Sequence, residues 1–422
     1  MLQSIFWIQS LRKKIIATLV PVLVYKFLAV IPVSWANTAA LAWILEANKG
    51  LAFFSALMGG WLERFSIILM GLAPYINAVI IIQLLGVIVP KIGDMQKEWE
   101  AGQKKINKFT RWLTLPIAFI QSYGMIILLN TLSASSWGWA IIDVTNVQLV
   151  LSSMMIITAG TIFLMWLWEV MTEYGIGNGI SIIITAWVLA ATPWVIWNLL
   201  GWAQYTLFFG LLLATLAIIY VIIKFTEGNR RIPIIYSRTG REEKSYFPIR
   251  VNQAGMIPII FAVSLVTFPT ILGQILSRSS GDTARSVSTF LLQYFDMTNP
   301  SWMLIIFYFL LVLAFSFFYI SITFNTEQVA ENIQKRGGYI PGIRPGADTA
   351  AFLSKVSNRL NFFGWSFLWL IAVLPYILGK LMNQTIDFII TGAWLIIIVS
   401  VILDVIRKVD AEVKMFDYSK FK

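Results

Sequence analysis

Ionisable side chains inside the apolar parts of this chain are the first candidates for ion or proton chemistry. They are few: Lys26, Glu63, Arg64 and Glu169. A charge within a membrane is costly and usually marks an ion site or a proton path. Lys26 can extend its ammonium group toward water. Glu63 and Arg64 can pair with each other, and Glu169 lies near the end of its apolar run. These residues therefore do not predict a proton relay.

Covalent chemistry has equally few candidates. The 422 residues include no Cys and no His, which excludes disulfides, thiol nucleophiles, imidazole bases and Cys/His metal sites. Asn178 and the serines near it lack a base, so an intramembrane enzyme ranks last among the functions considered. No G-x-x-x-x-G-K-[ST] loop is present, so a partner would have to spend any ATP or GTP. We expect no catalytic residue, no metal and no cofactor.

Long apolar segments set the architecture that positions these residues. Hydrophobic residues make up 58% of the chain and charged residues 13%, a balance typical of membrane proteins. Ten segments can cross ~30 Å of hydrocarbon at ~1.5 Å per helical residue. They are residues 15–33, 65–90, 113–132, 147–171, 179–200, 205–225, 255–276, 302–324, 361–379 and 385–405. The predicted fold class is therefore all-α, a polytopic membrane protein.

The basic residues predict the topology of these spans. Most of the 32 Lys and Arg residues fall at the two ends of the chain and in the even-numbered loops. Positive charge gathers in cytoplasmic loops, so both termini should be cytoplasmic, and the net charge of +11 needs no nucleic acid to explain it. The first span could instead be a signal peptide cleaved near Ala36, but its apolar run is long for one.

The second span is interrupted and has a counterpart in the seventh. Gly71 and Pro74 break its helical pattern, and the same G-x-x-P-x-I spacing recurs at Gly255 and Pro258. Ten spans divide into residues 1–200 and 201–422, and five spans per half make the repeat inverted. Paired interrupted helices point to a substrate path. A secondary transporter of a small solute shares this pattern and stays the alternative.

Two long polar loops carry clusters of basic residues. Arg230 and Arg231 lie in residues 226–250, and Arg344 lies in residues 325–358. Long ordered loops tend to be functional. The plainer interpretation is that these residues set orientation or contact anionic lipid.

Six segments carry a resemblance to a known family. They are Arg64-Phe65-Ser66-Ile67 with Pro74-Tyr75-Ile76, EAGQKKIN at 100–107, EYGIGNGIS at 173–181, Arg230-Arg231-Ile232-Pro233, VNQAG at 251–255 and IPGIRPG at 340–346. In this order and spacing they resemble the SecY family, whose members pass unfolded polypeptides across or into a membrane. The resemblance covers nearly the whole chain. It implies two inverted five-helix halves around an hourglass pore.

The resemblance also implies a ring of apolar side chains at the waist of the pore. The matching positions are Leu72, Ile76, Ile180, Ile184, Ile260 and Ile397. An aliphatic ring offers a passing chain no fixed hydrogen-bond partner, and it resists water and ions by dewetting when narrow. Leu72 replaces the Ile that is usual in the family, which should alter shape more than polarity. Without the resemblance, ordinary helix packing would explain each of these residues.

A plug and a lateral gate follow from the same resemblance. The plug would be the interrupted stretch 51–62, with Leu51, Phe53, Phe54, Ser55, Gly59 and Gly60; a re-entrant connector is the alternative. Spans two and three against seven and eight would form the gate, with Asn77, Gln83, Gln121, Asn252, Ser264 and Phe268. Polar groups across a closed seam contribute ~1–2 kcal/mol or less each, so the seam can part. Asn77 replaces the usual Ser or Thr.

The resemblance further implies partners and a location. Arg230, Arg231 and Arg344 match positions that dock the ribosome or the SecA ATPase, since guanidinium groups suit phosphates and carboxylates alike. Small membrane subunits of the SecE and SecG type are expected, with SecDF and YidC as further partners, and signal sequences and unfolded preproteins as cargo. The expected location is the bacterial inner membrane, with the plastid thylakoid membrane as the alternative.

Overall fold

The computed structural model describes most of the chain, which is mostly helical. The described residues are 8–37, 41, 65–97, 100–137, 140–186, 189, 205–238, 241–253, 255–276, 281–295, 301–381 and 392–420. They form two compact units. Unit 1 comprises Met1–Tyr205, Ser264–Leu304 and Val401–Lys422, and unit 2 comprises Thr206–Val263 and Ile305–Ser400. The predicted division at residue 200 stays a prediction.

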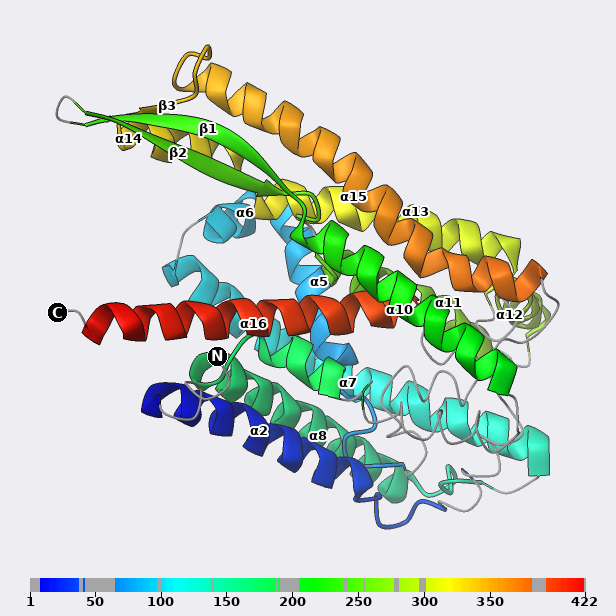
Figure 1. The fold of residues 1–422 in the computed structure, drawn as a ribbon. Coiled ribbons are helices and arrows are strands. Elements are labelled where there is room, and N and C mark those ends of the chain that lie inside the picture. The colour runs from blue at the N-terminus through cyan, green and yellow to red at the C-terminus, as the bar shows by residue number, and fades with distance from the viewer. Residues whose placement is uncertain are drawn as a thin grey trace. The chain divides into compact units, whose positions relative to one another are not determined.

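The long helices overlap predicted apolar segments, whereas three shorter helices lie largely outside them (Figure 1). Unit 1 contains α2 (Gln9–Val30), α5 (Ala73–Ile88), α6 (Pro90–Lys97), α7 (Glu100–Trp137), α8 (Val147–Tyr174) and α12 (Asp282–Tyr294). Unit 2 contains α14 (Thr326–Lys335), α15 (Ala347–Leu381) and all but the first residues of α10 (Tyr205–Glu227) and α13 (Trp302–Thr323). Helices α11 (Ile257–Leu276) and α16 (Gly392–Lys420) contribute to both. Several helices extend past the predicted apolar runs into the polar sequence beside them.

The core of unit 1 joins α7 and α8 to the irregular segment that precedes α5. Phe65 and Leu69 of that segment pack with Ile126 and Leu129 of α7 and Ile157 of α8. The segment is also bridged to the end of α2, because Val33 N–H donates to the Phe65 carbonyl and Ile67 N–H donates to the Ile31 carbonyl. Helix α8 lies alongside α2 (Figure 1). Helix α8 therefore supports the irregular segment that leads into α5.

The Gly/Pro motifs of spans two and seven lie at helix starts that share one local geometry. The half-helix expected before the first motif falls in residues 51–62, outside the described residues. Gly71 and Gly255 both have positive φ, 51° and 64°. Two residues later, α5 begins at Ala73 and α11 at Ile257, each with proline as its second residue. Glycine accepts the left-handed conformation at little cost, and proline is favoured in the first helical turn because it lacks the N–H that would stay unpaired. The repeated spacing therefore encodes the same helix start twice.

A second bend, which the sequence pattern did not predict, follows α5. Helix α6 turns by 113° relative to α5 across Val89. Pro90 disfavours helical backbone at the residue before it. Gln96 Nε2 then donates to the Ile82 carbonyl at 3.3 Å, so α6 folds back against α5.

The all-α class is wrong in one respect, because unit 2 contains a three-stranded sheet in the order β2-β1-β3. Strands β1 (Asn229–Arg238) and β2 (Arg241–Arg250) form an antiparallel hairpin, and β3 (Gly338–Tyr339) pairs with β1. Its buried face, including Ile232 and Ile234, packs on α14 and α15 (Figure 1). Alternating apolar residues in the loop 226–250 could have indicated these strands.

The helices include clear candidates for membrane spans. Within the described residues, Lys104–Asn130, Val147–Tyr174 and Trp302–Ile320 are long and apolar enough to cross a membrane, and the bent α5–α6 pair counts as a fourth if taken as one span. The remaining predicted spans stay a prediction.

Candidate functional site

The ring positions of unit 1 lie on two helix starts. Leu72 is the residue before α5 and is buried, and Ile76 begins the next turn, its N–H donating to the Leu72 carbonyl at 3.0 Å. Ile180 and Ile184 lie one turn apart in helical residues 179–186 and are half-buried. Positions four apart share a helix face, so each pair presents a short aliphatic stripe.

The ring positions of unit 2 have similar local settings. Ile260 is half-buried and occupies the same place after its proline as Ile76 does in α5. Ile397 is buried in α16, beside buried Ile396. The convergence of all six side chains in one ring stays a prediction.

The gate residues of unit 1 include two buried polar atoms without a partner. Gln83 Oε1 on α5 and Gln121 Oε1 on α7 are buried, and neither has a hydrogen-bond partner among the described residues. Asn77 on α5 and Ser264 on α11 are half-buried. An unpaired buried acceptor costs ~1–3 kcal/mol. The two glutamines are therefore poised to accept a hydrogen bond that the described residues do not supply.

The remaining gate positions are less informative. The Asn252 side chain is buried, and its Oδ1 accepts from Gly255 N–H at 3.0 Å, so this oxygen serves the turn that precedes α11. Phe268 lies within α11, but its side chain is outside the described part. The plug positions Leu51, Phe53, Phe54, Ser55, Gly59 and Gly60 also lie outside the described residues, as do Glu63 and Arg64.

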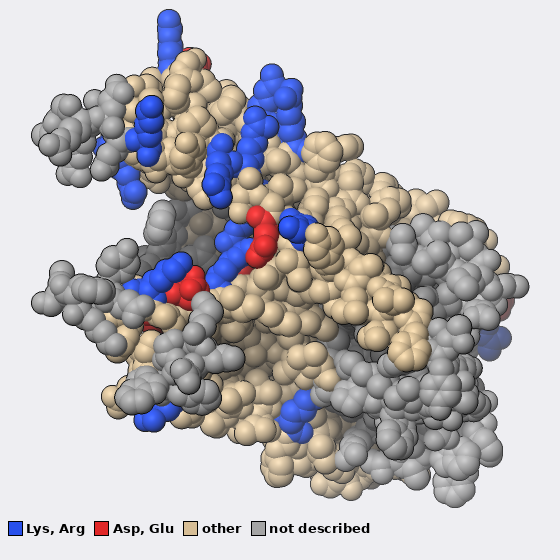
Figure 2. All heavy atoms as spheres, viewed as in Figure 1, with Lys and Arg blue, Asp and Glu red and all other residues tan. Residues whose placement is uncertain are grey.

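The basic loop residues are solvent-exposed. Arg230 and Arg231 begin β1, and Arg344 follows β3 in a turn whose Arg344 carbonyl accepts from Thr349 Oγ1 at 2.9 Å. Figure 2 shows several Lys and Arg side chains projecting from this surface. Side chains alternate across a strand, so Arg230 lies on the face of the hairpin that bears Ile232, and Arg231 lies on the opposite face. The outer face also carries exposed Pro233, Tyr246 and Pro248.

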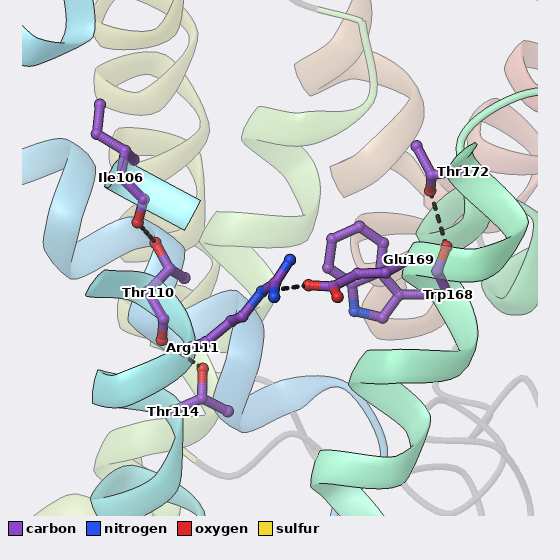
Figure 3. Close-up of polar contacts among 7 residues, drawn as sticks. All are labelled: Ile106, Thr110, Arg111, Thr114, Trp168, Glu169 and Thr172. Carbon is purple, nitrogen blue, oxygen red and sulfur yellow. Dashed lines mark hydrogen bonds and ion pairs between the residues drawn. The ribbon is translucent and has the colours of Figure 1, made fainter. Parts of the chain in front are cut away.

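Sequence reasoning missed the partner of Glu169. Arg111 Nε on α7 lies 2.6 Å from Glu169 Oε1 on α8, with side-chain exposures of 50% and 21% (Figure 3). Glu169 thus forms a structural ion pair between two helices. A single Arg at the start of an otherwise apolar span was the available signal, but spacing along the sequence does not reveal a contact between helices.

Comparisons with known proteins agree along the whole chain. A family model described as SecY matches residues 66–406. Protein translocase subunit SecY of Halalkalibacterium halodurans is 36% identical over 437 residues, which cover 100% of this chain and 99% of the relative. Its counterpart in Helicobacter pylori strain 26695 is 36% identical over 424 residues, which cover 97% and 98%.

Solved structures give the same fold. A SecY protein, described by a plug domain that stabilises the closed state of its translocation channel, has a TM-score of 0.66 at 20% identity, with 94% of this chain and 92% of that chain covered. Sec61 in the canine ribosome–channel complex from the endoplasmic reticulum has a TM-score of 0.62 at 18% identity, with the same coverage. These identities support the fold alone.

Proposed function

The chain belongs to the SecY family, and we propose that it is the protein-conducting channel subunit of a protein translocase. The observation that carries this proposal is the full-length match at 36% identity to a protein translocase subunit SecY. The subunit passes unfolded preproteins across the membrane and releases transmembrane segments sideways into lipid. It catalyses no reaction of its own, so a motor or a ribosome supplies the energy. The comparisons do not favour the alternative, a secondary transporter of a small solute.

The pore closes on an aliphatic ring. Leu72, Ile76, Ile180, Ile184, Ile260 and Ile397 are its members. The shared geometry of the two helix starts supports this assignment, since Ile76 and Ile260 follow Gly71 and Gly255 in the same way. Aliphatic side chains exclude ions by dewetting and still accommodate a polypeptide. Residues 51–62 act as the plug above the ring.

The lateral gate parts between spans two and three and spans seven and eight. Gln83 and Gln121 support this assignment, because their buried side-chain oxygens have no hydrogen-bond donor among the described residues. An arriving signal sequence or transmembrane segment separates the two sides of the gate, because the hydrogen bonds between them are weak. Asn77, Asn252, Ser264 and Phe268 complete the gate.

The chain has ten spans in two inverted halves, with both termini in the cytoplasm of a bacterium and the channel in its inner membrane; the plastid thylakoid is the alternative. Arg230, Arg231 and Arg344 dock SecA or the ribosome, and their exposure supports this role. A solved relative is described as a ribosome–channel complex. SecE and SecG-type subunits flank the channel, and SecDF and YidC assist it.

The test is reconstitution of the chain in vesicles with its small partner subunits, SecA, ATP and an unfolded precursor. We expect the precursor to become protected from external protease in an ATP-dependent manner. Vesicles without the chain are the control. Saturable uptake of one small solute by the chain alone, with no protected precursor, would instead support the transporter.

A further inference from the structure

One turn of α8 contacts both ring-bearing segments of unit 1. Trp168 packs its ring against Tyr75, with centroids 4.9 Å apart, and Tyr75 directly precedes Ile76. Both aromatic side chains are buried, at 9% and 6% exposure. The indole Nε1 of Trp168 has no hydrogen-bond partner among the described residues, so packing alone holds this ring. The position of Ile76 therefore depends on where Trp168 lies.

The same turn also seats the second ring-bearing segment. Thr172 Oγ1 donates to the Trp168 carbonyl at 2.8 Å and accepts from Gly179 N–H at 2.9 Å. Gly179 directly precedes Ile180. A Cβ added at Gly179 would collide with the Trp168 carbonyl oxygen. The helix that carries Ile180 and Ile184 is thus pressed directly onto the Trp168–Thr172 turn.

The turn is tied to a third helix by charge. Glu169 lies within it and pairs with Arg111 of α7 at 2.6 Å (Figure 3). The ion pair, the aromatic contact and the two hydrogen bonds of Thr172 Oγ1, here called the Thr172 relay, therefore involve five consecutive residues of α8.

We propose that the Trp168–Thr172 turn is the seat that positions Ile76 and Ile180, and that the Arg111–Glu169 ion pair holds this seat in place. Arg111 and Glu169 are positioning residues, because they act on the ring through Trp168 and Thr172. The proposal rests on the proposed function, since it needs the ring. It adds an electrostatic tie, remote from the pore lining, that sets how tightly unit 1's share of the ring closes.

The experiment measures the resting ion conductance of reconstituted channels without precursor. We expect Arg111→Gln and Glu169→Gln each to raise conductance by up to about fivefold, the factor that ~1 kcal/mol gives, which is the upper end for an exposed ion pair. The reversed pair, Arg111→Glu with Glu169→Arg, should return conductance toward the parent value. A merely stabilising role would alter the melting temperature but not the conductance at a temperature where all variants are folded.

Two further variants complete the design. Thr172→Val should leak because it removes both relay hydrogen bonds, whereas Thr172→Ser should not. The matched control for loss of an ion pair is Glu331→Gln in α14, whose exposed partner Lys335 lies 2.7 Å away. Ile76→Gly reports on the ring itself. If Ile76→Gly raises the resting conductance while the Arg111, Glu169 and Thr172→Val variants do not, the seat is refuted. If Ile76→Gly leaves the conductance unchanged, the ring of the proposed function is refuted instead.

Discussion

Arg230 and Arg231 are neighbours in the chain but lie on opposite faces of the β1–β2 hairpin. Arg230 is paired with Ile249, whose side chain is buried against α14 and α15, whereas Arg231 is paired with exposed Pro248. The outer face is therefore the open one. A large partner that approaches the hairpin meets Arg231 first, together with Tyr246.

This relationship predicts unequal effects of reversing the two charges. Arg231→Glu should weaken ribosome binding by a factor of about 5–30, which corresponds to ~1–2 kcal/mol, and Arg230→Glu should weaken it less. Binding of ribosomes to the reconstituted channel, measured at two salt concentrations, checks this, since a lost phosphate contact also reduces the salt dependence. Equal losses for the two variants would mean that the partner does not lie on the outer face.

The tight contact at Gly179 predicts a strong effect of a single methyl group. Gly179→Ala places a Cβ against the Trp168 carbonyl, 2.9 Å from Thr172 Oγ1 and 3.0 Å from Met171 Cβ. Overpacking of this kind costs ~1–3 kcal/mol, so the melting temperature of the purified protein should fall. Gly210→Ala in α10 is the matched control, because nothing lies within 4 Å of its added Cβ. An unchanged melting temperature for Gly179→Ala would contradict the contact.

Local signals in the sequence were sufficient for the helix starts and the exposed basic residues. Gly71 with Pro74 and Gly255 with Pro258 encode a left-handed residue followed by a first-turn proline, and both are determined by adjacent residues alone. The hairpin was missed because β1 and β2 were interpreted as a polar loop. Their buried residues, such as Ile232 and Ile249, become a pattern only when α14 and α15 supply the surface they cover.

Contacts between helices were beyond reach of the sequence. Arg111 and Glu169 are far apart in the chain, and periodicity predicts which face of a helix is apolar but not which residue of another helix meets it. The same holds for Trp168 between Tyr75 and Gly179. Residue types indicated what each group could do, and packing decided which groups met.

The unpartnered gate glutamines predict that apolar replacements strengthen the closed seam. Gln83→Leu and Gln121→Leu remove buried acceptors that lack a described partner, so each should raise the melting temperature and slow precursor translocation. Asn130→Leu in α7 is the control with the opposite expectation, because Asn130 Nδ2 donates to the Ile142 carbonyl and its Oδ1 accepts from Ile141 N–H and Ile142 N–H, and all three bonds would be lost. Melting curves and initial translocation rates check both. A lower melting temperature for Gln83→Leu and Gln121→Leu would indicate that their oxygens are paired.

The ring predicts a leak that depends on position within one helix. Ile76→Gly, Ile184→Gly and Ile397→Gly should each raise the resting ion conductance, because a shorter side chain widens the waist and allows water to wet it. Glycine also weakens a helix by ~1 kcal/mol, so a general loss of helix stability must be separated from a specific leak. Ile81→Gly on α5 provides this control, since Ile81 is exposed, at 38%, and carries the same propensity penalty as Ile76. Planar-bilayer recordings should show a leak for Ile76→Gly and none for Ile81→Gly. Equal conductance for these two variants would attribute the leak to a loosened helix and remove Ile76 from the ring.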